Sequence, residues 1–260
     1  MKTVKCQGGL GNQLFGLAFA HSVAHLSGKP VALDIASFRN YRYGYPFALQ
    51  GLAERLGLAV VSKPLLSHRL TGVMMRRMGL VGTDAKPPKT DKDSLSLVNG
   101  QAYFDGYWQN EAFIADPGVI RHEVRRFLLE RAPDVVAEDV VIHYRTYADE
   151  VVPGRRATPG AAYVARALAA IGPASRAVLV SDDAARALTQ LGDLADRLIP
   201  APPGDLYADM ARLLRARHLV LTNSSFSWWG GYCSGARTII YPEQDGFFHY
   251  PAPAARFVCL

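Results

Sequence analysis

The strongest constraint on the fold is the regular alternation of short apolar segments with helical segments in the second half of the chain. Runs such as AVLV, HLVL and TII are apolar at every position, which is typical of parallel strands covered on both faces. This half is therefore predicted to be a doubly wound parallel α/β domain. We expect strands at Val140–His143, Ala177–Ser181, Arg197–Ile199, Leu219–Thr222 and Arg237–Tyr241, and helices at Pro159–Ile171 (with Thr158 as N-cap), Asp183–Leu191, Asp205–Arg217 and Phe226–Cys233.

The first half opens with the same kind of unit. Thr3–Cys6 is predicted to be a strand, and it is followed by the glycine-rich turn Gly8–Gly11. We expect Asn12 to cap the next helix, and Pro30–Asp34 to form the second strand. Few elements can be assigned in the later part of this half. We expect a polar loop at Thr83–Ser94 and a short helix at Ile120–Leu129. We expect two domains, residues 1–135 and 136–260, joined near RAPDVVAED.

The composition and net charge limit the classes of binding partner. The chain has 260 residues, of which 49% are hydrophobic and 20% charged, as in globular proteins, and its net charge is +6. That charge suits an anionic ligand, a nucleic acid or an anionic membrane surface, but the basic stretches are short and no zinc-finger or RNP motif occurs. We expect no nucleic-acid partner. Three distant cysteines, no signal-peptide pattern and no membrane-length apolar run favour a cytoplasmic protein, with peripheral association with the inner membrane left open.

Polar segments follow several of the predicted strands. In doubly wound sheets, ligands bind beyond the carboxyl ends of the strands. That rule selects four segments: Gly8–Gln13, His143–Asp149, Ser181–Asp183 and Asn223–Ser225. We expect a ligand site there.

The chemistry of these segments suits a nucleotide. Backbone N–H groups and hydroxyls at Ser224 and Ser225, where a helix begins, can hold a phosphate, although either serine would serve equally as a plain N-cap. Arg145 is a two-pronged donor suited to a diphosphate. Asp182 and Asp183 can accept from a base or a ribose hydroxyl, and Asp183 can instead cap a helix.

Two further patterns are interpreted as structural. Trp228 and Trp229 are expected in the core, and the glycines after them are expected to allow a helix to approach the sheet closely. Asp91-Lys92-Asp93 has the D-x-D form of metal-dependent glycosyltransferases, but it lies in a polar segment away from any apolar strand, so we predict no metal site.

Taken together, the segments resemble the bacterial α-1,2-fucosyltransferase family, glycosyltransferase family 11. The resemblance runs in order from residue 8 to about residue 248, and the Ser-Phe-Ser-Trp-Trp-Gly run is its most specific part. It is carried by GGLGNQLFGLAFAHSVAHLSGKPVALD, GYWQNEAFI, VSDD, DMARLLRARHLVLTNSSFSWWGGYC, and Tyr241-Pro242 with Phe247-Phe248.

The resemblance implies a GT-B fold, in which two Rossmann-like domains face each other across a cleft and the C-terminal domain, a doubly wound parallel sheet, binds GDP-fucose. It implies inverting, metal-independent transfer of L-fucose, without a cofactor, to a hydroxyl of a glycan acceptor. Surface polysaccharide or O-antigen synthesis is the expected setting, and a lipid-linked acceptor is left open.

The resemblance also implies roles for individual residues. Arg145 would bind the β-phosphate and the leaving oxygen. His143, with Asp182 or Asp183, would lie near the guanosine. The remaining donor-binding residues would be Asn223, Ser224, Ser225 and Phe226 around the diphosphate, and Gly9, Gly11 and Asn12 from the N-terminal side.

One departure from the family pattern matters. The family has His-x-Arg-Arg-Gly-Asp, whereas this chain has HYRTYAD, so that Thr146 replaces the second arginine; Arg155 or Arg156 is a candidate substitute for it. This motivates two alternatives, a GT-B enzyme with another nucleotide sugar and an inactive sugar- or nucleotide-binding relative. The candidates for the general base are Asp34, Asp105, Asp149 and Glu150, and we assign Asp149 as catalytic together with Arg145.

Overall fold

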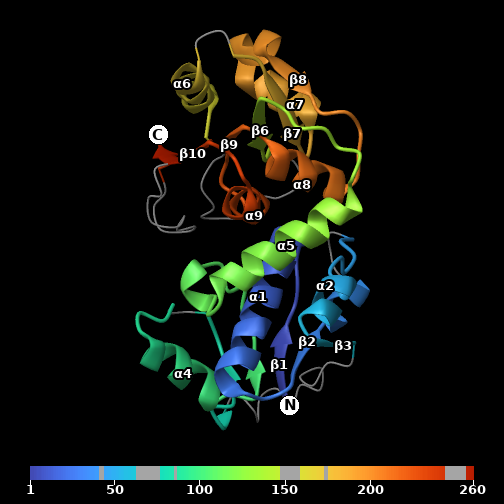
Figure 1. The fold of residues 1–260 in the computed structure, drawn as a ribbon, viewed down its shortest axis with the longest axis vertical. Coiled ribbons are helices and arrows are strands. Elements are labelled where there is room, and N and C mark those ends of the chain that lie inside the picture. The colour runs from blue at the N-terminus through green and yellow to red at the C-terminus, as the bar shows by residue number, and fades with distance from the viewer. Residues whose placement is uncertain (41–43, 63–76, 85–86, 147–158, 173–174, 244–255) are drawn as a thin grey trace. The chain divides into compact units, whose positions relative to one another are not determined.

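The computed structural model describes residues 1–40, 44–62, 77–84, 87–146, 159–172, 175–243 and 256–260 (Figure 1). The chain divides into two compact units, Met1–Val124 and Arg125–Leu260, and the division falls within helix α5, Pro117–Arg131. Each unit has its own parallel β-sheet. The predicted α/β class with two Rossmann-like parts is confirmed, and the assignment of 1–135 and 136–260 as functional domains stays a prediction.

The first unit contains a sheet of five parallel strands in the order β3-β2-β1-β5-β4. The strands are β1 (Lys2–Lys5), β2 (Val31–Asp34), β3 (Ala59–Val61), β4 (Val81–Gly82) and β5 (Tyr103–Phe104). The helices are α1 (Leu10–Ser27), α2 (Gln50–Arg55) and α4 (Asp91–Asn99), with 3-10 turns η1 (Ala36–Asn40) and η2 (Glu111–Phe113). Helix α1 is buried along most of its length, because apolar residues occupy nearly all its faces.

The GYWQ segment contributes to the core of this unit. The indole ring of Trp108 is buried and stacks on Phe19, with ring centroids 3.7 Å apart. The carboxylate of Asp84 accepts the backbone N–H groups of Tyr107 and Trp108, which holds Trp108 at a positive φ of 57°. In this chain the segment therefore has a packing role.

The second unit contains a sheet of six parallel strands in the order β11-β10-β9-β6-β7-β8. The strands are β6 (Val140–Tyr144), β7 (Ala177–Ser181), β8 (Leu198–Pro200), β9 (His218–Val220), β10 (Thr238–Tyr241) and β11 (Phe257–Cys259), and the helices after α5 are α6 (Ala161–Ile171), α7 (Ala184–Leu191), α8 (Leu206–Arg215) and α9 (Ser225–Cys233), with the 3-10 turn η3 (Gly192–Arg197). The chain runs outward from β6 through β7 to β8 and then returns to place β9 on the other side of β6. The junction of β6 and β9 is therefore a topological switch point, where doubly wound sheets bind ligands.

The aromatic pair of α9 lies in the core as predicted. Trp228 and Trp229 are both fully buried, and Trp228 stacks on Tyr232 at 4.4 Å between ring centroids. A Cβ atom at Gly230 would lie 2.4 Å from Leu213 Cδ2, so the close approach that this glycine allows is to helix α8 rather than to the sheet. For Gly230 the expected approach to the sheet was therefore wrong, and for Gly231 it stays a prediction.

Several predicted element boundaries were also wrong. The segment predicted as a polar loop up to Ser94 becomes helical at Asp91, because Thr90 and Asp93 form a capping box. Helix α6 begins at Ala161 with Gly160 as its N-cap, and Thr158 lies outside the described residues. Strands β3, β4, β5 and β11 and helix α2 were not predicted.

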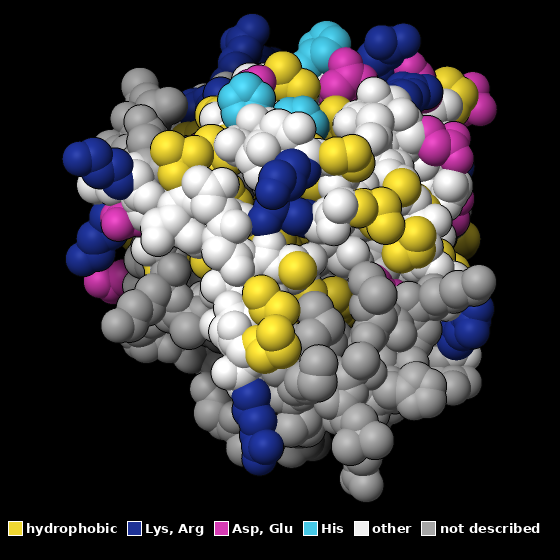
Figure 2. Space-filling model, turned by 90° about the horizontal axis from the view of Figure 1, so that it is seen from below, with side chains coloured by type: hydrophobic (Ala, Val, Ile, Leu, Met, Phe, Trp, Pro, Cys, Tyr) yellow, Lys and Arg dark blue, Asp and Glu magenta, His cyan; other side chains and the backbone are white. Residues whose placement is uncertain are grey.

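The surface view shows hydrophobic side chains scattered among charged and polar ones on one face of the described part of the chain (Figure 2). Large exposed hydrophobic side chains come from separate elements, for example Leu95 on α4 and Ile199 on β8. Within the residues described, no helix combines the length and the apolar character needed to cross a bilayer.

Candidate functional site

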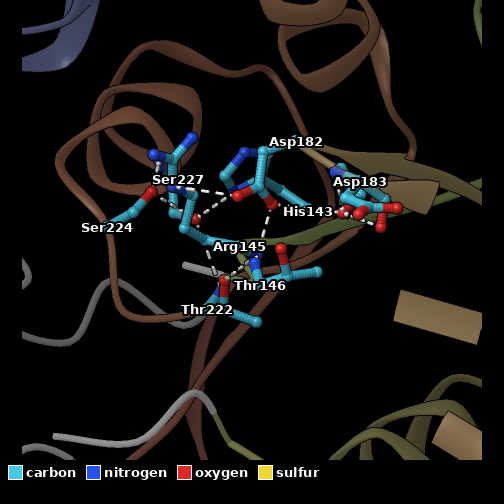
Figure 3. A network of polar contacts seen from close by, with 9 residues as sticks. His143, Arg145, Thr146, Asp182, Asp183, Thr222, Ser224 and Ser227 are labelled. Carbon is cyan, nitrogen blue, oxygen red and sulfur yellow. Dashed lines mark hydrogen bonds and ion pairs between the residues drawn. The ribbon is translucent and has the colours of Figure 1, made fainter. Parts of the chain in front are cut away.

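The polar residues that follow β6 and β7 lie opposite each other. Tyr144 and Ser181 are register partners at the ends of these parallel strands, so Arg145 and Asp182 come next on adjacent strands. Arg145 Nε lies 3.4 Å from Asp182 Oδ2, and the Thr146 N–H donates to Asp182 Oδ1 at 2.7 Å (Figure 3). Two of the four predicted segments are thus brought into direct contact.

The turn between β9 and α9 forms the second part of the site. Ser224 is the N-cap of α9, and its Oγ accepts the N–H of Ser227 at 3.0 Å. The N-capping alternative for Ser224 is therefore correct. On the β6 side, the Arg145 N–H donates to Thr222 Oγ1 at 3.2 Å, so residues from β6 and β9 meet at the switch point.

The hydroxyl of Ser227 connects the β6 side of the site to the turn before α9. This residue was not predicted from the sequence. Its Oγ is fully buried and lies 3.2 Å from Ser224 Oγ and 2.5 Å from His143 Nδ1. The Thr222 N–H also points to this oxygen, at 3.4 Å. The spacing of Ser227 three residues after a possible N-cap was a signal in the sequence, but nothing in the sequence indicated that His143 would reach it.

His143 is held neutral by its surroundings. The side chain is buried, and its ring stacks on Phe226 with centroids 5.0 Å apart. Burial, with the positive charge of Arg145 as a second cause, lowers the pKa of His143 to about 4, although Asp182 acts in the opposite direction. At neutral pH the imidazole therefore has one N–H donor and one acceptor nitrogen.

The two aspartates of the Ser-Asp-Asp segment have different environments. Asp183 is the N-cap of α7 and accepts the N–H of Arg186 at 2.9 Å, so the capping interpretation of this residue is correct. Asp182 instead faces Arg145 and Thr146 (Figure 3). A contact of either carboxylate with guanosine stays a prediction.

Thr146 occupies the position that holds the second arginine in the family that the sequence resembles. Its side chain is buried, and within the described residues its Oγ1 has no hydrogen-bond partner. Buried hydroxyls usually have one, because leaving a polar group unpaired in the interior costs about 1–3 kcal/mol. Thr146 therefore places a potential donor beside Arg145 where the family has a charge.

Asn223 and Ser225 flank the cap of α9. Both are partly buried, and Ser225 is the first residue of the helix. The first N–H groups of a helix have no intrahelical acceptor, and the dipole makes this end favourable for anions. The arrangement thus combines a guanidinium, hydroxyls, a neutral imidazole and a helix N-terminus, a set suited to binding a phosphorylated ligand.

The predicted residues of the first unit lie on the glycine turn. Gly8 has φ +86°, and a Cβ atom there would lie 2.6 Å from Asn12 Nδ2. This turn starts α1 at Leu10 with Gly9 as N-cap, so the prediction that Asn12 caps the helix was wrong. Asn12 Oδ1 instead accepts from Gln109 Nε2 at 2.7 Å, and Gly11 is buried in the helix. The donor-binding roles of Gly9, Gly11 and Asn12 stay predictions.

The candidates for the general base differ in environment. Asp34 is buried, and its two oxygens accept from Tyr103 Oη and the Ala36 N–H, both at 2.9 Å, which indicates a structural role. Asp105 forms an ion pair with Lys5 at 2.9 Å. The other candidates, Asp149 and Glu150, lie outside the described residues, as do Arg155 and Arg156.

The D-x-D segment forms the start of a helix. Asp93 accepts the N–H of Thr90, as the capping box requires, and also that of Lys89. Across the ranges that the structure describes, no group of three or more histidine, cysteine or acidic side chains is arranged to hold a metal ion.

Comparisons with known proteins find structures of similar fold but no similar sequence. Neither a protein-family model nor a curated protein sequence matches the chain. The structure is similar to that of NodZ α-1,6-fucosyltransferase co-crystallized with GDP, with a TM-score of 0.50 and 15% identity over 93% of this chain and 95% of that chain. Fucosyltransferase NodZ from Bradyrhizobium gives a TM-score of 0.48 with 16% identity over 95% and 96% of the two chains. POFUT1 in complex with GDP gives 0.48 with 12% identity over 92% and 98%.

Proposed function

We propose that this chain is a glycosyltransferase that moves L-fucose from GDP-fucose to a hydroxyl group of a glycan acceptor. The observation that carries the proposal is the contact of Arg145, at the end of β6, with Thr222, two residues before the N-cap of α9, at the switch point of the second sheet. Similarity of fold to NodZ, which was co-crystallized with GDP, supports a GDP-linked donor. The resemblance of the sequence to family 11 supports the finer assignment, an inverting α-1,2-fucosyltransferase.

The chemistry follows from the charge that develops during transfer. Breaking the bond between fucose and GDP leaves negative charge on the diphosphate and an oxocarbenium-like sugar. We assign Arg145 to that leaving charge, with the first-turn N–H groups of α9 and the hydroxyl of Ser225 beside it. Burial keeps His143 neutral, so it adds no second positive charge to the site. Its ring would instead donate or accept a hydrogen bond at the nucleoside.

The remaining assignments belong to the same proposal. Asn223 and Phe226 would line the donor pocket, and Gly9, Gly11 and Asn12 would approach it from the first unit. Transfer would proceed without a metal ion, with Asp149 as the proposed base. The product would be a surface glycan such as an O-antigen.

The presence of Thr146 in place of an arginine favours a second candidate function, transfer from a different nucleotide sugar. Because it removes a positive charge from the family pattern, the donor could be a different nucleotide sugar handled by the same framework. A catalytically inactive relative that only binds the nucleotide is the remaining alternative.

Equilibrium binding separates these candidates. Titration of the purified chain with GDP, UDP and CMP, followed by hydrolysis assays with the corresponding nucleotide sugars, should show binding of GDP and slow release of fucose from GDP-fucose, with or without EDTA. Preference for UDP or CMP would favour the second candidate, and GDP binding with no turnover on any glycan acceptor would favour the inactive relative. Loss of turnover in EDTA that Mn²⁺ restores would contradict the metal-free mechanism.

A further inference from the structure

The carboxylate of Asp182 engages two consecutive residues of the neighbouring strand end. One oxygen accepts the Thr146 N–H at 2.7 Å, and the other lies 3.4 Å from Arg145 Nε. Both interactions cross from the end of β7 to the end of β6, and Figure 3 shows the carboxylate between the two residues. A single side chain therefore fixes both the backbone and the cation at this edge of the sheet.

Arg145 is held from two sides. Its backbone N–H donates to Thr222 Oγ1 after β9, and its guanidinium meets Asp182 after β7. The side chains of Arg145 and Asp182 are 25% and 17% exposed, so solvent screens their attraction less than at an open surface. A guanidinium has one donor on Nε and four on its terminal nitrogens. Pairing at Nε thus fixes the orientation of the guanidinium plane.

We infer that Asp182 is a positioning residue that acts through Arg145, which it holds for the leaving diphosphate, and that it does not read the nucleotide base. The inference rests on the role proposed above for Arg145. A carboxylate that reads a guanine edge directs its oxygens to N–H donors of the base, whereas those of Asp182 face Thr146 and Arg145. Positioning of this kind matters to rate, because misplacement of a catalytic group by about 1 Å can cost roughly 10²-fold.

The ion pair can be tested without any nucleotide. The Arg145 Nε–Hε signal in a ¹H–¹⁵N spectrum is assigned by its loss in Arg145→Lys, and it should shift in Asp182→Asn. The matched control is Asp205→Asn, since Asp205 is an aspartate of the same unit whose carboxylate caps α8 through the N–H groups of Tyr207 and Ala208. An Arg145 signal that does not respond to Asp182→Asn would overturn the inference, whatever the protein binds.

Nucleotide discrimination then separates positioning from base reading. We expect Asp182→Asn to keep its Kd for GDP within about 3-fold of the wild type while kcat falls roughly 10- to 100-fold. The ratio of Kd values for GDP and inosine diphosphate, which lacks the 2-amino group of guanine, should not change. A collapse of that ratio would show that Asp182 contacts the base, and would contradict positioning.

A double-mutant cycle completes the design. In an Arg145→Ala background, adding Asp182→Asn should lower kcat by no more than about 3-fold, because a residue that acts through Arg145 has nothing left to position. Full additivity of the two losses would refute the inference. If the wild-type chain bound no GDP at all, the proposed function would fail first, and the NMR measurement would still decide whether Asp182 holds Arg145.

Discussion

His143 Nδ1 lies 2.5 Å from Ser227 Oγ, and this contact joins strand β6 to the first turn of α9. The imidazole is buried among these elements, and burial lowers its pKa to about 4. The folded state therefore favours the neutral ring, whereas the unfolded chain gains a proton below its ordinary pKa of about 6.5. The contribution to stability is complete above pH 6.5 and is lost as the pH falls towards 4.

The first prediction concerns the pH dependence of stability that the lowered pKa of His143 causes. Between pH 7.5 and pH 5.0, His143 should account for a loss of about 2 kcal/mol in the free energy of unfolding, since each pKa unit corresponds to about 1.4 kcal/mol. Urea unfolding of the wild type and of His143→Gln at both pH values measures this loss. An equal pH dependence in the two proteins would show that His143 is not held neutral.

Ser227 should be a stability determinant, and its neighbour Ser225 should not. Ser227→Ala removes the fully buried oxygen that meets His143, Ser224 and the Thr222 N–H, and it should lower the free energy of unfolding by about 1–3 kcal/mol. Ser225→Ala, at a partly exposed position, should change it by less than about 0.5 kcal/mol. Thermal and urea melts of both variants test this contrast, and equal losses would contradict the network.

Arg145→Lys should separate charge from geometry. Lysine keeps the positive charge but lacks the planar two-pronged donor. We expect near-normal melting and detectable GDP binding, with turnover reduced by roughly 10²-fold, as when a preorganised donor to a developing anion is lost. A variant that melts early but turns over at the wild-type rate per folded molecule would instead identify Arg145 as a structural residue.

Thr146→Val tests the hydroxyl that occupies the position of the second arginine. Valine has nearly the same shape but no buried oxygen, so the free energy of unfolding should stay the same or rise by up to about 1 kcal/mol in the absence of ligand. If the hydroxyl meets the diphosphate, the Kd for GDP should rise about 5- to 10-fold, the effect of one lost hydrogen bond. Calorimetric titration measures the change, and an unchanged Kd would exclude the hydroxyl from donor binding.

Gly230→Ala should disturb the packing of α9 on α8. The added Cβ would lie 2.4 Å from Leu213 Cδ2 and 3.1 Å from Leu213 Cβ, so the Leu213 side chain or one of the two helices must shift. Overpacking of this kind costs about 1–3 kcal/mol, which thermal melting can detect. Gly160→Ala is a suitable control, because nothing lies within 4 Å of a Cβ atom there. Equal melting temperatures for the two variants would contradict the packing of α9 against α8.

The sequence by itself determined most elements of the second unit, the opening of the first unit, and the edge of the sheet at which polar groups gather. Uniformly apolar runs alternating with helical segments specify parallel strands, and polar residues directly after those strands must share one edge. This local logic placed Arg145, Asp182 and Ser224 just after strands, where the structure has them, and it recognised Trp228 and Trp229 as core residues. The binding roles of the three polar residues stay predictions.

Only the tertiary structure decided which of these groups meet. The pairing of Arg145 with Asp182 depends on the register of β6 and β7, which are far apart in sequence, and the contact between His143 and Ser227 depends on how α9 packs at β6. Helix α1 begins three residues earlier than an N-cap at Asn12 would require, and the close neighbour of Gly230 is Leu213 rather than the sheet. Such outcomes depend on packing between distant segments, because the same local sequence is compatible with more than one neighbour until the chain folds.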